Sequence, residues 1–92
     1  MAKFLIEVPH PNEPFACARA VEVFLRTGSH FLAGAEWGCK DGEHKAWMIV
    51  DVDSKDEARS IVPPAFRGDA RIVGLNRFVL KDIESALREH PR

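Results

Sequence analysis

Two histidines and a cysteine, His10, Cys39 and His44, carry the donor atoms that zinc and nickel prefer in proteins. Cys39 and His44 flank residues 40–43, a polar stretch with a glycine that is typical of a hairpin loop, so their side chains should face each other. His10 follows a first apolar run and stands between two prolines. These three residues are candidate metal ligands. Because no CxxC or HxxxH spacing is present, the alternative is that Cys39 and His44 only close a hairpin and His10 only ends a strand.

The cysteines permit further interpretations. Cys39 could act as a nucleophile with His44 as its base, although no third group that would orient the histidine is identifiable. Cys17 falls on the apolar face of a predicted helix, where a buried, inert thiol is expected. Two cysteines in a chain with no recognisable signal peptide predict reduced thiols rather than a disulfide framework.

A second candidate site combines carboxylates with an indole. Glu36 and Trp47 are predicted cross-strand neighbours, and Glu7 and Asp51 point the same way from the two central strands. Enclosed beside an indole, Glu36 or Glu7 could serve as a general base. Trp47 would then stack on a small organic acid, with Arg67 holding its carboxylate. The alternative is that these acids form ion pairs across a dimer and only set its register.

Strands and helices predicted from the periodicity must position these residues. The hydrophobic pattern predicts strands within 3–8, 31–37, 46–52 and 70–78, and helices within 13–27, 54–62 and from residue 80 until it fades at 90–91. Asn12 is a candidate N-cap of the first helix and Gly28 its C′ residue. Ser54 and Glu57 form a capping box that starts the second helix. Two prolines at 63–64 end that helix, and a loop is expected over 65–69.

The hairpin specifies its own register. With residues 40–43 in the loop, Trp37 faces Ala46 and Glu36 faces Trp47. Alternation of side chains then gives one wholly apolar side, which is the predicted core: Phe31, Ala33, Ala35, Trp37, Ala46, Met48, Val50 and Val52. The other side mixes apolar and acidic residues: Leu32, Glu36, Trp47, Ile49 and Asp51. A slip by one residue would place carboxylates in the core.

This order of elements predicts an α+β fold, the ferredoxin-like βαββαβ sandwich with an added C-terminal helix, formed by residues 1–92 as a single domain. Its four-stranded antiparallel sheet has the order 4-1-3-2, with both main helices on one face. The topology should bring His10, Cys39 and His44 together at one end of the sheet, with Arg67 nearby and His30 at the opposite end. The uncovered face would expose Leu5, Leu32, Trp47 and Ile49, which predicts a homodimer through this open face.

The chain resembles the dimeric α/β-barrel superfamily, which includes muconolactone isomerase-like enzymes and cofactor-free monooxygenases. The resemblance covers nearly the whole length but lies in the order and size of the elements, so it carries no site residues. It implies two sheets that face each other around a pocket.

Composition excludes several classes of function. The net charge of −1 offers no basic surface for nucleic acid, and no apolar run is long enough to span a membrane. No phosphate-binding glycine loop or dinucleotide fingerprint is present, so no cofactor is expected. We therefore expect a cytoplasmic protein that binds a small organic molecule, as a cofactor-free isomerase or monooxygenase or without turnover. The alternatives are a metal- or redox-responsive module that uses His10, Cys39 and His44, and a structural protein with no catalytic site.

Overall fold

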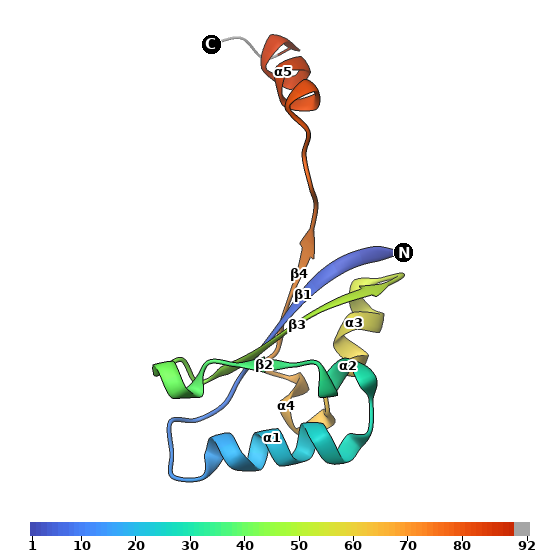
Figure 1. Ribbon diagram of the computed structural model, residues 1–92. Helices are drawn as coiled ribbons and strands as arrows, with labels where there is room; N and C mark the ends of the chain where they lie inside the picture. Colours follow the sequence, from blue (N-terminus) through green and yellow to red (C-terminus); the bar gives the residue numbers. More distant parts are fainter. Residues whose placement is uncertain (90–92) are drawn as a thin grey trace.

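The computed structural model describes residues 1–89 and shows an α+β fold with one four-stranded antiparallel sheet. The strands lie in the order β2-β3-β1-β4, which is the predicted order 4-1-3-2. The helices α1, α3 and α4 lie beside the sheet, and α5 stands away from it at the end of an extended segment (Figure 1). Within residues 1–89 no helix is both long and apolar enough to cross a bilayer.

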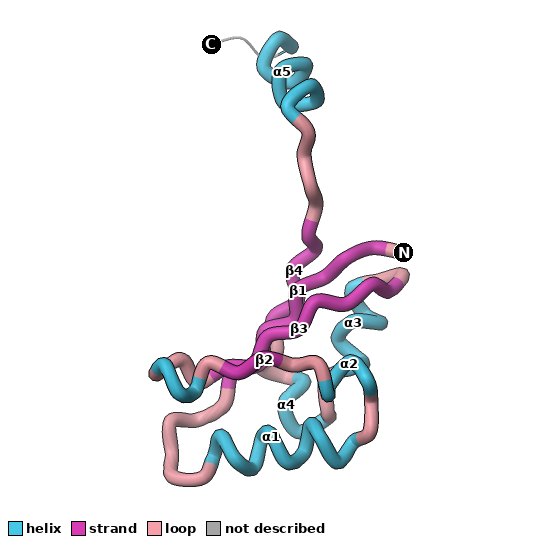
Figure 2. The backbone as a smooth tube through the Cα atoms, viewed as in Figure 1, coloured by secondary structure: helices cyan, strands magenta, loops and turns pink. Residues whose placement is uncertain are grey.

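The two central strands, β1 (Ala2–Pro9) and β3 (Lys45–Val52), form the longest pairing of the sheet. It runs from Ala2 opposite Val52 to Pro9 opposite Lys45 without a bulge. The edge strands are short: β2 covers only Glu36–Trp37 and β4 covers Arg71–Leu75. The long antiparallel run in the backbone trace is therefore that of β1 and β3, with β4 along the other side of β1 (Figure 2).

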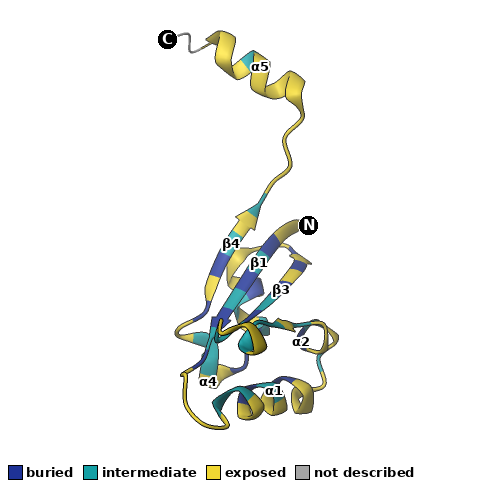
Figure 3. Ribbon diagram, turned by 60° about the vertical axis from the view of Figure 1, so that its left-hand side comes forward, coloured by how far each residue is buried: buried dark blue, intermediate teal, exposed yellow. Residues whose placement is uncertain are grey.

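One face of the sheet forms the core, because side chains alternate between the two faces. On β3, every second residue from Ala46 to Val52 is buried, and on β1 the buried positions are Phe4, Ile6 and Val8. Phe24 of α1, Ala58 of α3 and Val62 complete this core. The alternation is visible as dark bands along β1 (Figure 3). The predicted core side of β3 is thus confirmed.

The first helix, α1 (Ala16–Thr27), begins later than predicted. Residues 12–13 form a bend and 14–15 a turn, and Phe15 precedes the helix with a left-handed φ of 64° rather than Asn12 acting as the N-cap. Two prolines in this approach limit the conformations that the chain can take there. The predicted C-terminus is confirmed, since Gly28 adopts a left-handed φ of 79° that suits glycine.

The structure corrects the first arm of the predicted hairpin. Residues His30–Ala33 form a short helix, α2, instead of a strand. The Ser29 hydroxyl accepts a hydrogen bond from the Phe31 N–H at 3.2 Å, which caps this helix turn. Leu32 is consequently buried, with 1% of its surface exposed, and does not belong to the open face. The register of the remaining pair is confirmed, with Glu36 opposite Trp47 and Trp37 opposite Ala46.

The second half of the chain follows the capping prediction closely. Ser54 caps α3 (Lys55–Ile61) by accepting from the Glu57 N–H at 3.0 Å, and the Glu57 carboxylate accepts from the Asp53 N–H at 3.0 Å. The second of the two prolines, however, begins a further short helix, α4 (Pro64–Arg67), which extends into the predicted loop. Proline at the first position of a helix loses no hydrogen bond, which explains why the pair allows a new helix to begin.

The C-terminal part of the chain leaves the sheet. β4 ends at Leu75, earlier than the predicted residue 78, and Gly74 pairs with Phe4 without a bulge; a Cβ at Gly74 would lie 3.6 Å from the Phe4 ring. The helix α5 (Leu80–Glu89) is mostly exposed along its length (Figure 3), and its apolar residues Leu80 and Leu87 are among the exposed ones. The predicted fading of this helix at 90–91 lies outside the described residues.

The position of Leu32 gives a test of the corrected fold. We expect Leu32→Ala to lower the free energy of unfolding by about 2 to 4 kcal/mol, because it leaves a cavity beneath α2. The matched control is Leu25→Ala, since Leu25 is 59% exposed and its truncation should change stability by less than about 0.5 kcal/mol. Urea denaturation followed by circular dichroism measures both. Equal midpoints for the two variants would contradict the burial of Leu32.

Candidate functional site

The site lies where the central ladder ends. β1 stops at Pro9, and the next residue, His10, continues the pairing through its backbone: its N–H donates to the His44 carbonyl at 3.0 Å. This bond places the two histidines on adjacent chain segments at one end of the sheet. Their rings meet edge to face, with centroids 5.5 Å apart and an interplanar angle of 73°.

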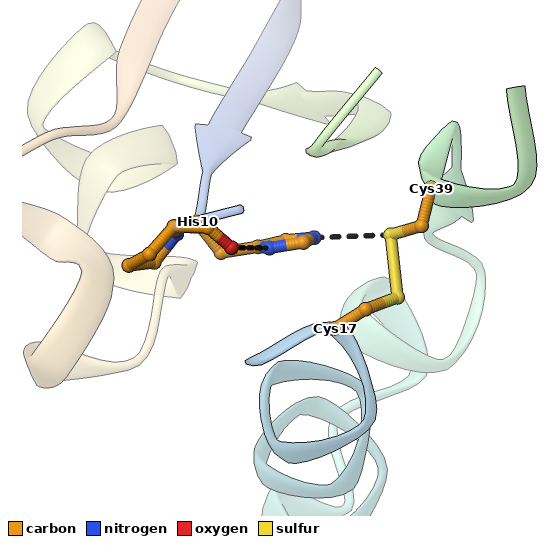
Figure 4. The surroundings of a disulfide bond; sticks show 4 residues. His10, Cys17 and Cys39 are labelled. Carbon is orange, nitrogen blue, oxygen red and sulfur yellow. Dashed lines mark hydrogen bonds between the residues drawn. A yellow bond between two sulfur atoms is a disulfide. The ribbon is translucent and has the colours of Figure 1, made fainter. Parts of the chain in front are cut away.

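The His10 imidazole is held through one nitrogen atom and has the other beside a sulfur. Its Nδ1 lies 3.1 Å from the Pro11 carbonyl oxygen, and its Nε2 lies 3.0 Å from the Cys39 sulfur (Figure 4). A carbonyl oxygen can only accept, so the proton of this hydrogen bond belongs to Nδ1. In the neutral ring the lone pair is then on Nε2 and points toward the sulfur. A carbonyl that holds the second nitrogen of a histidine is the usual outer partner of a metal-ligating imidazole.

The donor atoms of His10, Cys39 and His44 all lie within 4.8 Å of one another. The structure thus brings together the three residues that the sequence singled out as candidate metal ligands. His10 is buried, with 8% of its surface exposed, and the other two are half-buried. Trp37 closes one side, with its ring 6.0 Å from that of His10 and 4.9 Å from that of Phe24. This apolar wall lowers the local dielectric and strengthens any charge interaction in the site.

Cys17 also belongs to this site. Its sulfur forms a disulfide with that of Cys39, and the two Cα atoms are 6.6 Å apart (Figure 4). The prediction of two reduced thiols, with Cys17 inert on an apolar helix face, is therefore wrong for this structure. The helix stripe was assigned correctly, but the second residue of α1 lies at the end of the helix nearest the Cys39 turn. The βαββαβ topology brings the start of the first helix to this end of the sheet, but topology alone does not give the distance between the two sulfur atoms.

A tight turn presents Cys39 to the histidines. Residues Cys39–Asp41 form a single 3₁₀ turn, η1, which closes at Gly42 with a left-handed φ of 81°. A side chain at Gly38 would place its Cβ 2.8 Å from the Glu43 carbonyl oxygen and 2.8 Å from the Trp47 ring. Only glycine fits between these groups, so the residue directly before this turn must be glycine.

The second group of predicted site residues lies on the open face of the sheet. The Trp47 indole N–H donates to the Glu7 carboxylate at 3.1 Å, and the Lys45 ammonium lies 3.9 Å from the same oxygen. Glu36 is exposed opposite Trp47 in the register. A shallow hollow of about 310 Å³ is lined by Leu5, Gly34, Glu36, Trp47, Met48 and Ile49. This hollow is open to solvent in the single chain.

The structure does not bring Arg67 or Asp51 to the indole. The Arg67 guanidinium donates to the Val62 carbonyl at 3.0 Å and to the Ser60 carbonyl at 3.1 Å, and so it holds the end of α3. Asp51 is exposed and lies opposite Lys3 in the register, toward the other end of the ladder. Arg67, which was predicted to hold the carboxylate of an organic acid, and Asp51 therefore lie apart from the Trp47 indole.

The chain matches no protein-family model, no curated protein and no solved structure. Its function must therefore be inferred from the geometry of its own residues.

The disulfide should contribute to stability. Cys17 and Cys39 are 22 residues apart, and chain entropy assigns a cross-link of that span about 3 kcal/mol. We expect reduction by a dithiol to lower the urea midpoint accordingly. The Cys17→Ser variant should start at the lower midpoint and not respond to the dithiol. An unchanged midpoint of the wild-type chain, with two free thiols counted only after reduction, would contradict this contribution to stability, and two free thiols counted before reduction would contradict the cross-link.

Proposed function

We propose that the protein is a metal-binding module whose reduced form takes up one zinc ion or a similar transition metal ion through His10, Cys39 and His44. The observation that supports this function best is the convergence of three donor atoms within 4.8 Å. Two imidazoles and a thiolate form a donor set that suits zinc, and three protein ligands leave one position for a further group. Metal can bind only when Cys39 is a thiolate, so the disulfide must first be reduced.

Two features of the site support this function. The Pro11 carbonyl holds the Nδ1 proton of His10, so the Nε2 lone pair is directed at the site before any metal arrives. The His10–His44 backbone bond and the β1–β3 ladder hold both histidines on rigid elements. Preorganisation of this kind lowers the entropy lost on binding. A reducing compartment such as the predicted cytoplasm would favour the form that binds.

Metal uptake by the reduced protein tests the proposal. We expect one zinc per chain, and a loss of affinity of about a hundredfold or more in Cys39→Ala and His44→Ala, since even an outer partner of a ligand is worth about ten- to a hundredfold. Competition with a chromophoric chelator measures the affinities after the reductant has been removed.

The control for this experiment is His30→Ala. His30 lies in α2, where its ring stacks on Phe31 with a centroid distance of 4.1 Å, and it lines a hollow with Met1 and Asp51 at the other end of the sheet. Its loss should leave zinc affinity unchanged. No uptake by the reduced wild-type protein, or uptake that neither His44→Ala nor Cys39→Ala alters, would refute the function.

A second candidate function is supported by the hollow beside Trp47. The predicted homodimer would cover this face with a second sheet and enclose a small organic acid near Glu36, as the resemblance to dimeric α/β-barrel proteins implies. Ile49, 62% exposed at the centre of the face, and the exposed stripe of α5 are apolar surface that a second copy would cover. Glu7 already accepts from Trp47, so Glu36 is the carboxylate that is available as a base.

Sedimentation measures the proposed dimer. We expect Ile49→Lys to convert it to a single 10.3 kDa chain, because the substitution would place a charge in an apolar contact. Val23→Lys is the control, since Val23 is an exposed residue of α1 on the helix side of the sheet. A wild-type chain that sediments as a monomer at high concentration would rule out the enclosed pocket.

A further inference from the structure

We propose that Cys17 is the fourth ligand of this metal site, so that the site alternates between a disulfide state and a zinc state with a Cys2His2 donor set. This inference rests on the proposed zinc function. It adds that the two states exclude each other and that a peroxide converts the zinc state into the disulfide state.

The geometry of the disulfide supports a shared ligand role. The two sulfur atoms are joined, so reduction leaves both thiols next to each other and next to the His10 Nε2. Around a tetrahedral zinc with Zn–S bonds of about 2.3 Å, two sulfurs lie roughly 3.8 Å apart. That separation is reached by rotation of the cysteine side chains, without a change in the 6.6 Å between their Cα atoms.

The nitrogen donors are spaced in the same way. A sulfur and an imidazole nitrogen on one tetrahedral zinc are roughly 3.5 Å apart, because the Zn–N bond is about 2.0 Å. The His10 Nε2 and the Cys39 sulfur are 3.0 Å apart, and no pair among the three donors exceeds 4.8 Å. Shifts on the order of 1 Å therefore bring these three donors to one centre, and the Cys17 sulfur, once released from that of Cys39, reaches this centre by rotation of its own side chain.

Charge favours the fourth ligand over a water molecule. With Cys39 as the sole thiolate, zinc would leave a net positive charge beside the buried His10 and the Trp37 wall. Two thiolates neutralise the ion. An uncompensated charge in such surroundings is costly, and no carboxylate is among the donors that converge there within residues 1–89.

The two states exclude each other because the sulfur electrons that would bind zinc are used for the S–S bond in the disulfide state. In the zinc state both cysteines are thiolates. Hydrogen peroxide takes two electrons from them: the S–S bond forms, the O–O bond breaks, two protons are taken up, and two water molecules and a free Zn²⁺ are released. Zinc itself is not oxidised or reduced. A dithiol reverses the step by thiol–disulfide exchange and is itself oxidised.

The experiment uses reduced, zinc-loaded wild-type protein, titrated with hydrogen peroxide in the presence of a zinc indicator. We expect one zinc released per chain, with the thiol count falling from two to zero, and uptake restored by a dithiol. Zinc that stays bound after the disulfide has formed would overturn the inference. This arm needs no variant and so does not depend on how a variant folds.

A second arm compares the reduced Cys17→Ser variant with wild type after cobalt loading. We expect zinc affinity to fall about a hundredfold and the sulfur-to-cobalt absorption to fall to roughly half, as one of two thiolates is lost. Unchanged affinity and absorption would overturn the role of Cys17 and leave the three-ligand function intact. Failure of the reduced wild type to bind zinc at all would refute the proposed function itself.

Discussion

The pairing of β1 with β3 is the constraint on which the rest of the structure depends. Its eight register pairs fix which side chains face the helices, and its continuation through the His10–His44 backbone bond determines where the histidines meet. A shift by one residue would move Ile6 and Met48 out of the core and turn Glu7 into it. The candidate metal site and the open face are thus two consequences of a single register.

The helices α1 and α4 pack against the end of the sheet through a small number of aromatic side chains. Phe24 of α1 contacts Trp37 of β2, with ring centroids 4.9 Å apart, and Phe66 of α4, with centroids 5.9 Å apart. This aromatic cluster holds α1 against the end of the sheet. The Cys17–Cys39 disulfide then joins the first turn of α1 to the strand connection. Side-chain packing and the covalent link therefore act on the same pair of elements.

The sequence could predict the parts of this fold that are encoded by strict alternation. Ala46 to Val52 alternates cleanly, and this pattern determined both the core face and the pairing of Glu36 with Trp47. Residues 31–33 are a short apolar run between two glycines, and such a run has no period that separates strand from helix. The Ser29 cap favours a helix for this run, and Leu32 therefore points into the core and not to the open face.

The convergence of His10, Cys39 and His44 could be predicted because topology alone places strand ends together. The disulfide could not, because it depends on how far α1 extends toward the sheet end and on the left-handed Phe15 that precedes it. Composition rules assign cysteines by compartment and cannot report such a distance. The position of the Arg67 side chain could not be predicted either, because the unpredicted helix α4 directs its guanidinium to backbone carbonyls.

The two candidate sites are joined by one turn. Cys39 follows Gly38, and a Cβ at Gly38 would meet the Trp47 ring at 2.8 Å, so the backbone that carries the metal-site sulfur rests on the indole of the open face. On the preceding residue, Trp37 faces His10. The metal site and the open face therefore share the backbone of this one turn, and the close approach of Gly38 to the Trp47 ring fixes how they lie relative to each other.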